Sequence, residues 1–352
     1  MLKAWPQPTG WNGLPEKTGI TTEMAQRFQD AGSFANELKG GVVAIGNFDG
    51  VHRGHQAVLA RATEISEAAG VSSSVLSFEP HPRTVFRPDQ PVFRLTPAPM
   101  KAMILGQLGF DAIVEQPFDK AFSSQSAEDF VTGILCGRLG VHHVVTGYDF
   151  HFGRGREGNP DFLMKAGVRH GFGVTLVEQY QDENAEVVSS SRIREALARG
   201  DIAEANGLLG YRYAVSAKVL HGKKLGRTLG YPTANMALPP ETGLEPGIYA
   251  VRFRRADGTI HDGVASFGRR PTVAEDGAAL LLETFLFDFS GDLYGETCTV
   301  SFVSRLRGEE KFDGLDELVA QMKMDEAEAR AALGSLQPLS PLDAAMTFGP
   351  AG

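Results

Sequence analysis

Residues 41–55 decide the fold of the first half of the chain, and they read Gly41-Val-Val-Ala-Ile-Gly-Asn-Phe-Asp-Gly-Val-His-Arg-Gly-His55. The apolar run that ends at Gly46 is typical of a strand buried on both faces of a parallel sheet. From Gly54 onward the apolar residues are spaced along one helix face, and Gly70 suits a C-terminal cap. The sequence therefore predicts a strand, a glycine-rich turn and a helix. A turn of this kind lies where open α/β sheets bind their ligands.

Strands and helices continue to alternate up to about residue 207. We expect strands at 73–78, 112–115, 141–146 and 173–177, and helices at 98–108, 126–138 and 161–170. Alternation of this kind indicates βαβ units and a parallel sheet. A helical stretch from Ser191 to about Leu209 ends this part, so residues 41–207 are predicted to form an α/β domain.

The second half has short strands with frequent turns. The expected strands are at 213–220, 247–254, 261–267, 280–287 and 297–306, which is typical of an antiparallel barrel or sandwich. An amphipathic helix near residues 315–322, with Asp313 as a candidate N-cap, closes a domain at 211–335. Residues 1–40, with a weak helical candidate at 22–29, are expected to form an extension, and residues 336–352 a tail.

Composition and charge exclude several classes of protein. With 352 residues, of which 42% are hydrophobic and 22% charged, the chain is expected to be globular with roughly two domains. It has no run near ~20 apolar residues and no apolar segment of a signal peptide, so we expect a cytoplasmic protein without a membrane partner. A net charge of −9 argues against nucleic acid as a partner but not against small anionic ligands. Cys136 and Cys298 are expected to be buried free thiols. Self-association is left open.

The first group of candidate residues lies in the turn after the first strand. Its glycines allow the backbone to approach a phosphate, and the following helix start supplies free N–H groups and partial positive charge. His52 and His55 would face the same anion. This arrangement suits adenylyl transfer, in which charge develops on phosphates and no protein nucleophile is needed. A zinc-binding pair, or ordinary residues at a helix start, are the alternatives for the two histidines.

The H-x-G-H arrangement resembles the signature of the nucleotidyltransferase superfamily, and the string from Gly46 to His55 resembles the bacterial bifunctional riboflavin kinase/FMN adenylyltransferase (FAD synthetase) family. The segments 78–82 (Phe-Glu-Pro-His-Pro), 147–158 and 188–194 (Val-Ser-Ser-Ser-Arg-Ile-Arg) resemble three further motifs of that family. The resemblance implies that ATP is bound by Gly46, Asn47, Phe48, Asp49, Gly54, Ser189, Ser190, Arg192 and Arg194. It implies that the flavin is bound by His81, Asp149 and Phe150.

Plain structural roles remain open for some of these residues. His81 lies between two prolines and would also fit a rigid surface turn, and Phe150 would fit the core. The serines would also fit an N-cap that is followed by solvent-facing arginines.

The second group of candidate residues begins after the first strand of the second domain, at His221-Gly-Lys-Lys-Leu-Gly-Arg-Thr-Leu-Gly-Tyr-Pro-Thr-Ala-Asn235. Its glycines indicate a flexible loop able to lie over phosphates. A threonine hydroxyl and an asparagine amide are neutral oxygen ligands that suit Mg²⁺ already held by nucleotide phosphates. The segment resembles the P-T-A-N motif of riboflavin kinases. This implies ATP binding by Gly222, Lys223, Gly226, Arg227, Thr233 and Asn235, with Mg²⁺ at Thr233 and Asn235.

Two later segments also resemble riboflavin kinases. Residues 263–273 resemble the G-V-x-N-I-G-x-R-P-T motif and imply a flavin-binding Arg270, with Ser266 where asparagine is usual. Glu283 matches the family's catalytic glutamate, which implies a general base for the riboflavin 5′-hydroxyl. An outward-facing strand residue is the alternative for Glu283, a surface residue for Arg270, and a solvated pair for Lys223 and Lys224.

The resemblance covers about residues 41–334. It implies an α/β plus β architecture: a Rossmann-like nucleotidyltransferase domain with a parallel sheet, then a riboflavin-kinase antiparallel β-barrel with a terminal helix. The implied reactions convert riboflavin and ATP to FMN, and FMN and ATP to FAD and pyrophosphate, both with Mg²⁺. Two alternatives are a riboflavin kinase whose nucleotidyltransferase domain is inactive or repurposed, and a non-catalytic flavin-binding regulator.

Overall fold

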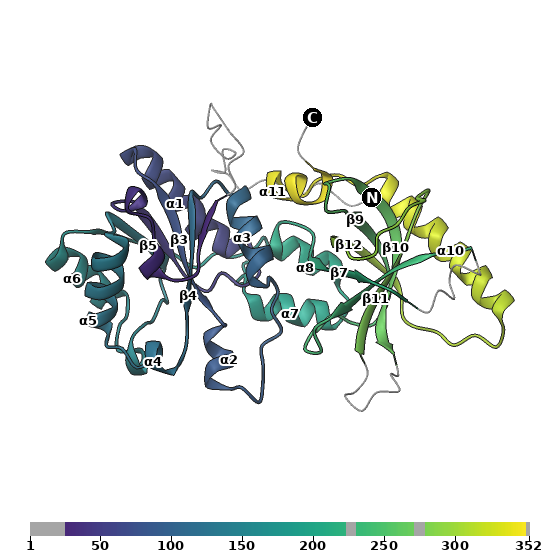
Figure 1. Cartoon of the computed structure of the whole chain (residues 1–352), viewed down its shortest axis with the longest axis horizontal. Helices are drawn as coiled ribbons and strands as arrows, with labels where there is room; N and C mark the ends of the chain where they lie inside the picture. Colours follow the sequence, from purple (N-terminus) through teal and green to yellow (C-terminus); the bar gives the residue numbers. More distant parts are fainter. Residues whose placement is uncertain (1–24, 223–229, 271–278, 350–352) are drawn as a thin grey trace.

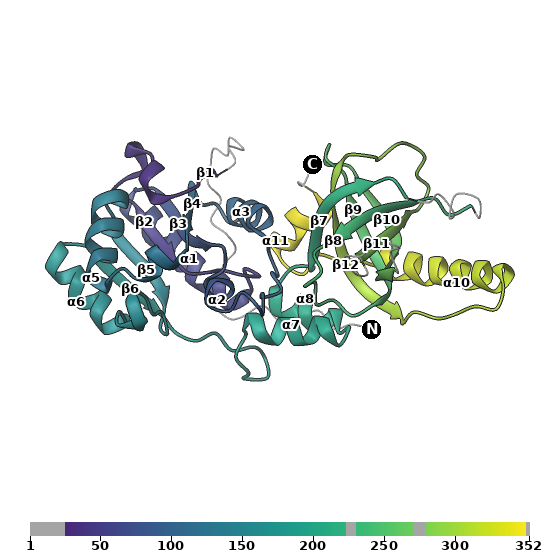
Figure 2. The ribbon, with the colours of Figure 1, turned by 60° about the horizontal axis from the view of Figure 1, so that its bottom comes forward.

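The computed structural model describes residues 25–222, 230–270 and 279–349. They form two lobes that lie side by side along the longest axis of the molecule (Figures 1 and 2). The first lobe is a parallel sheet covered by helices, and the second is a closed antiparallel barrel with a helix beside it. The α/β plus β architecture expected from the sequence is therefore confirmed.

The sheet of the first lobe has six strands in the order β1-β4-β3-β2-β5-β6, and all neighbours are parallel. The strands are β1 (Gln26–Phe28), β2 (Val42–Ile45), β3 (Ser73–Glu79), β4 (Ala112–Pro117), β5 (His143–Gly147) and β6 (Gly173–Val177). From β2 the chain moves outward through β3 and β4, and then returns to the other side of β2 to form β5 and β6. The strand order thus reverses at β2. Ligands of open α/β sheets bind beyond the carboxyl ends of the strands at such a point.

Helices cover both faces of this sheet. The α-helices are α1 (Arg53–Ala69), α2 (Pro82–Phe86), α3 (Ala98–Gln107), α4 (Lys120–Ser123), α5 (Ala127–Asp129) and α6 (Pro160–His170), and a π-helix η3 spans Phe130–Leu139. Short 3-10 helices lie at Ala31–Ser33, Asn36–Leu38 and Arg154–Arg156. Alternate residues of β2 belong to different cores: Val42 packs on the side of α1, and Val43 on the side of η3. Burial on both sides explains why this strand is a continuous apolar run.

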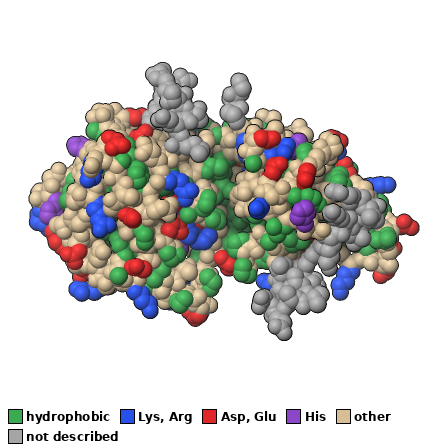
Figure 3. All heavy atoms as spheres, in the orientation of Figure 1, with side chains coloured by type: hydrophobic (Ala, Val, Ile, Leu, Met, Phe, Trp, Pro, Cys, Tyr) green, Lys and Arg blue, Asp and Glu red, His purple; other side chains and the backbone are tan. Residues whose placement is uncertain are grey.

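Two helices, α7 (Ser190–Ala198) and α8 (Ile202–Leu209), lie between the lobes (Figure 2). The sequence suggests one helical stretch here, but Gly200 has a φ of 73° and separates two helices. One buried hydrophobic cluster includes Val51 of the first lobe, Leu209 of α8 and Phe302 of the barrel, so the lobes share a core. Hydrophobic side chains are also visible along the furrow between the lobes (Figure 3).

The barrel closes in the order β10-β11-β8-β7-β12-β9. Its strands are β7 (Ala214–Leu220), β8 (Thr233–Leu238), β9 (Gly247–Arg254), β10 (Ile260–Arg270), β11 (Ala279–Leu286) and β12 (Thr297–Arg307). The sequence analysis does not predict β8, because its first residues, Thr233 to Asn235, belong to a motif that we interpret as a loop. The terminal helix α10 (Leu315–Gly334) begins after Gly314 rather than after Asp313.

The ends of the chain differ from the expectations. Gln26–Phe28, inside the weak helical candidate, is the edge strand β1, which pairs with β4 and is held by Arg27 to Glu115 bonds of 2.8 and 2.9 Å. A three-residue edge strand has too few residues to show a period of two. Near the other end, α11 (Pro341–Asp343) and the π-helix η5 (Ala344–Phe348) pack on the barrel, and Leu342 and Met346 belong to its core.

Both cysteines are free. Cys298 is buried, as expected, and Cys136 is partly exposed. Over the residues that the structure describes, no helix combines the length and the apolar character needed to cross a membrane.

Asp343 anchors the C-terminal segment, and Asp343→Ala is expected to lower the free energy of unfolding by about 3–5 kcal/mol. Its carboxylate is fully buried, pairs with the guanidinium of Arg212, and accepts bonds from Thr347 Oγ1 (2.8 Å) and Leu339 N (2.9 Å). Removing it leaves a buried guanidinium without its counter-charge. Urea unfolding followed by circular dichroism measures the loss.

The matched control for this prediction is Glu64→Ala, which removes the partner of Arg61 at the surface of α1. Solvent screens that pair, so we expect a much smaller change. Equal losses in the two variants would contradict the prediction.

Candidate active sites

The loop that follows β2 lies at the point where the strand order reverses. A Cβ at Gly46 would lie 2.9 Å from the ring of Phe48, and one at Gly54 would lie 3.2 Å from the ring of His52. Side chains at these two positions would therefore displace the rings that pack there. The loop brings Gly46, Phe48, His52 and Gly54 together, as the motif suggests.

His52 and His55 form a stacked pair at the start of α1. Their ring centroids are 3.7 Å apart at an angle of 18°, and His52 caps the helix by accepting a bond from His55 N (3.3 Å). The ring of Phe48 contacts His55 edge-on at 5.3 Å. The Nδ1 atom of His55 is buried without a hydrogen-bond partner. The described residues contain no group of three His, Cys, Asp or Glu placed to hold a metal, so they give no support to the zinc alternative.

Burial keeps both imidazoles neutral. It lowers the pKa of His52 to about 4, and it lowers the pKa of His55 well below the usual value, helped by the nearby His52. A neutral imidazole still carries one N–H donor. At neutral pH the pair therefore offers hydrogen bonds to an anion rather than positive charge.

These lowered pKa values predict a loss of stability in acid. Below pH 6.5 the unfolded chain protonates its histidines while the folded chain does not, so stability falls as the pH decreases from 6.5 toward 4 and does not change through these groups above 6.5. For His52 alone the expected loss from pH 6.5 to pH 5 is about 2 kcal/mol. Thermal unfolding at several pH values tests this. His52→Asn should lose less stability on acidification, and an equal loss in variant and parent would contradict the assignment.

Asp49 stands at the centre of a buried charge network. Its carboxylate accepts bonds from the backbone of Leu95 (3.3 Å) and Thr96 (3.1 Å), pairs with Arg194, and lies 3.5 Å from Arg94 Nε. With 2% of its surface exposed, Asp49 is almost completely enclosed. It therefore joins the glycine-rich loop to the segment before α3 and to α7.

Glu79, at the end of β3, is the second carboxylate of this network. It accepts two bonds of 2.8 Å from Arg94 and one of 2.7 Å from Lys101 Nζ, which also bonds Ser77 Oγ at 2.6 Å. Burial opposes its ionisation, but the bonds from Arg94 and the charge of Lys101 lower the pKa of Glu79 to about 2. Two cations thus meet at Glu79, and one of them, Lys101, is fully buried.

The start of α7 meets the same loop. Ser190 Oγ donates to the carbonyl of Asp49 (2.8 Å), and Arg194 Nε donates to the carbonyl of Phe93 (2.7 Å). Ser189 is the N-cap, as the structural alternative suggests, and accepts a bond from Arg192 N (3.3 Å).

Arg192 is placed differently from Arg194. Its guanidinium pairs with three carboxylates, Asp182 (2.6 Å), Glu186 (3.2 Å) and Glu204 (3.1 Å). These bonds hold it among acidic groups, so the structure does not bring it to the histidine pair.

The three flavin candidates of the first domain separate into two places. His81 is the N-cap of α2 and accepts a bond from Arg83 N (3.2 Å). Burial lowers its pKa to about 4, helped by the charges of Arg94, Arg194 and Lys101 and opposed by that of Asp49, so it lies near the charge network. Asp149 is exposed after β5. Phe150 is partly buried and stacks on Phe152, with ring centroids 5.4 Å apart. It packs against the core on the η3 side of the sheet, which contains Val43.

Three barrel strands align the candidate residues of the second domain in one row. Glu283 of β11 lies directly opposite Asn235 of β8 on one side and Ser266 of β10 on the other. Their chain neighbours Leu282, Met236 and Phe267 are fully buried in the barrel. Because side chains alternate along a strand, the three polar residues lie on the outer face.

Thr233 and Gly222 join this row. Asn235 Nδ2 donates to the carbonyl of Thr233 (3.1 Å), and a Cβ at Gly222 would lie 2.5 Å from the same nitrogen. Gly222, Thr233 and Asn235 therefore come together beside Glu283. Lys223, Gly226, Arg227 and the side chain of Arg270 lie outside the described residues.

Comparison with known proteins shows that each half of the chain matches a family. Residues 34–192 match the FAD synthetase family, and residues 209–333 match the riboflavin kinase family. A bifunctional riboflavin kinase/FMN adenylyltransferase from Pseudomonas fluorescens is 45% identical over 295 residues, which cover 84% of this chain and 94% of that one. The chain belongs to the bifunctional riboflavin kinase/FMN adenylyltransferase family. The resemblance seen in the motifs is thus confirmed.

A further relative carries the same family name, and one solved structure is similar to this chain in fold. The bifunctional riboflavin kinase/FMN adenylyltransferase of Escherichia coli K12 is 39% identical over 300 residues, which cover 85% of this chain and 95% of that one. A crystal structure described as a macrolide-efflux protein from Streptococcus pneumoniae has a TM-score of 0.76 and 29% identity, and covers 88% of this chain and 99% of that chain.

Sequence reasoning missed Arg94 and Lys101 in the adenylyltransferase half of this family member. A signal for Lys101 exists, because it is a cation among apolar residues in the expected helix at 98–108. Arg94 has no comparable signal: one carboxylate partner, Glu79, ends β3, and the other, Asp49, lies in the loop after β2.

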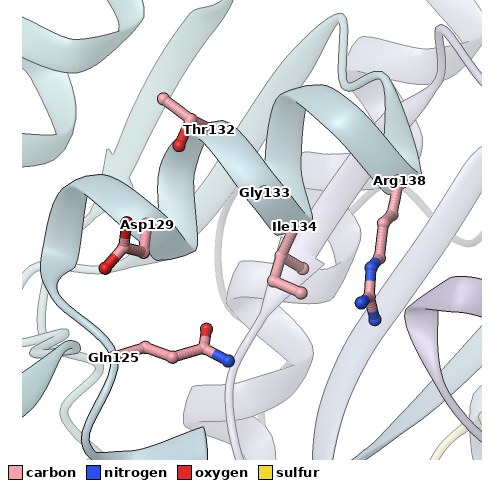
Figure 4. A pocket seen from close by; sticks show the side chains of 6 residues that line it. All are labelled: Gln125, Asp129, Thr132, Gly133, Ile134 and Arg138. Carbon is pink, nitrogen blue, oxygen red and sulfur yellow. The ribbon is translucent and has the colours of Figure 1, made fainter.

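A separate pocket of about 370 Å³ lies at the π-helix η3 (Figure 4). Its lining residues are Gln125, Asp129, Thr132, Gly133, Ile134 and Arg138. None of the candidate residues of either family motif lines it, so it plays no part in the proposals below.

Proposed function

We propose that the barrel phosphorylates riboflavin to FMN with ATP, and that the α/β domain then adenylylates FMN to FAD with release of pyrophosphate. The observation that carries this proposal is that each lobe holds its own polar constellation within its own family match: the stacked His52 and His55 in one, and the row of Ser266, Glu283 and Asn235 in the other. We further propose that the protein acts in the cytoplasm on small molecules, without nucleic acid.

In the first lobe, we assign the loop and the start of α1 to the phosphates of ATP. An oxygen of the FMN phosphate attacks the α-phosphorus, a new P–O bond forms, and the bond to pyrophosphate breaks. The N–H donors of neutral His52 and His55 and the helix N-terminus would stabilise the charge that develops on the phosphates. Ser190 and Arg194, which bond the same loop through Asp49, are assigned to the pyrophosphate side.

In the barrel, we assign Glu283 as the general base. Its carboxylate would accept the proton of the riboflavin 5′-hydroxyl as that oxygen attacks the γ-phosphorus of ATP, and ADP leaves. Ser266 stands beside Glu283 on β10 and supplies a hydroxyl where riboflavin kinases usually have an amide. The Ser266 hydroxyl can donate one hydrogen bond and can also accept, on the same face of the barrel as Glu283.

Thr233 and Asn235 have side chains that suit a Mg²⁺ ion arriving with ATP. Both offer neutral oxygens, and the bond from Asn235 Nδ2 to the Thr233 carbonyl fixes which side of the amide carries the nitrogen. Gly222 leaves open the space that a Cβ would fill against Asn235. When bound, the ion would neutralise phosphate charge. We assign Thr233 and Asn235 as its holders and Gly222 as the residue that lets the phosphates approach.

A time course of the purified protein with riboflavin, ATP and Mg²⁺ tests the whole proposal, with riboflavin, FMN and FAD separated by chromatography. FMN followed by FAD is the expected result. FMN alone would favour a kinase whose other domain is repurposed. Flavin that binds without turnover would favour a regulator.

A further inference from the structure

The loop between β2 and α1 holds two residues, Phe48 and Val51, in a backbone conformation that they do not favour. The φ angles of Phe48 and Val51 are 47° and 38°, and that of Gly50 is 87°. Residues with a Cβ seldom adopt left-handed backbone, and a β-branched residue such as Val51 is an outlier there. His52 follows directly, so a relaxed loop would move its ring. The loop therefore needs partners outside itself.

Both peptide groups of Gly50 have such partners. Its N–H donates to Thr96 Oγ1 (2.8 Å), before α3, and its carbonyl accepts a bond of 2.7 Å from the buried hydroxyl of Tyr211, which lies 161 positions further along the chain. The next carbonyl, that of Val51, accepts from Gln56 Nε2 (2.8 Å), which also donates to the carbonyl of Leu209 (2.8 Å). Tyr211 thus holds the Gly50 carbonyl directly, and the end of α8 is joined to the next carbonyl of the loop through Gln56.

The barrel holds Tyr211 in place. The residue is 2% exposed and is followed by Arg212, whose guanidinium pairs with buried Asp343. One position further, the carbonyl of Tyr213 accepts a bond of 2.8 Å from Phe302 N in β12. Burial raises the pKa of Tyr211 well above the usual value, so its hydroxyl remains a donor at neutral and mildly alkaline pH.

We propose that Tyr211 is a positioning residue for adenylyl transfer: its hydroxyl holds the Gly50 carbonyl and thereby the backbone that carries His52. Tyr211 lies within the riboflavin kinase match, residues 209–333, and not within the FAD synthetase match, residues 34–192. The adenylyltransferase site is therefore completed by a residue from the kinase part of the chain. This inference rests on the proposed adenylyl transfer by the first lobe.

Tyr211→Phe in the full-length protein removes only the hydroxyl. We expect the kcat for converting supplied FMN to FAD to fall about tenfold, equivalent to about 1.4 kcal/mol. The KM values for FMN and ATP should change by less than about twofold, because a misplaced catalytic group weakens the transition state more than substrate binding. The kcat for riboflavin phosphorylation should stay at the parental value, which also shows that the variant folds.

The matched control is Tyr213→Phe. Tyr213 is equally buried, and its ring packs on Phe93 and Phe302 with centroids 6.4 and 5.7 Å away. It should keep both activities. A Tyr211→Phe protein that forms FAD within about twofold of the parental kcat would overturn the proposal, and so would a parallel fall in riboflavin phosphorylation or an equal fall in Tyr213→Phe. If the parent itself made no FAD, the proposed function would fail instead.

Discussion

Glu283→Gln is expected to lower FMN formation about a thousandfold and to leave the conversion of supplied FMN to FAD at the parental rate. An amide cannot accept the proton of the riboflavin 5′-hydroxyl, so the attacking oxygen loses its base. Glutamine has nearly the same size as glutamate and should keep its place between Asn235 and Ser266. The histidine pair that we assign to adenylyl transfer lies in the first lobe, so FAD formation from supplied FMN should not change.

The two reactions are measured separately, by supplying either riboflavin or FMN with ATP and Mg²⁺. Glu241→Gln is the matched control, because Glu241 is exposed in the same lobe beyond the end of β8, and this variant should keep both activities. Equal loss of both reactions in Glu283→Gln, or unchanged FMN formation, would remove Glu283 from the role of general base.

The sequence predicts best those elements that are long or strongly patterned. The strand before Gly46 is apolar throughout because both faces are buried, and the helix after it ends at Gly70, which adopts the left-handed conformation of a C-cap. β8 is not predicted, because Thr233 and Asn235 end a glycine-rich segment that we interpret as a loop, although polar and apolar residues alternate from Thr233 to Met236. Likewise, the segment around Asp343 is expected to be a tail, because the sequence alone does not show that Asp343 pairs with Arg212, which lies 131 positions earlier.

In the candidate sites, too, some residues can be predicted from local sequence patterns and others cannot. Motifs locate the histidine pair and Glu283, since these residues lie next to recognisable turns and strands. The side chains that support them come from elsewhere: Lys101 from α3, and Tyr211 from the segment after α8. Their contacts join residues far apart in the chain, so they follow from the packing of elements and have no local sequence pattern.

His52→Asn is expected to reduce FAD formation from supplied FMN by about 10²–10³-fold and to leave FMN formation unchanged. His52 has two functions in the structure: it caps α1 by accepting a bond from His55 N, and its ring stacks on His55. Asparagine is among the best N-cap residues, so the helix start should persist. The imidazole N–H, which we assign to the phosphates of ATP, is lost. Activity should therefore fall far more than stability.

Comparison with His52→Ala separates the two functions, because alanine removes the cap as well and should cost about 1 kcal/mol of stability beyond the asparagine variant. Thermal unfolding and FAD formation are measured on both variants. His170→Asn is the matched control. His170 lies on α6 and pairs with Glu128 at the surface, and this variant should retain full activity. If His52→Asn made FAD at the parental rate, His52 would act only as a helix cap, and the phosphate-binding role would pass to His55 and the backbone of the loop.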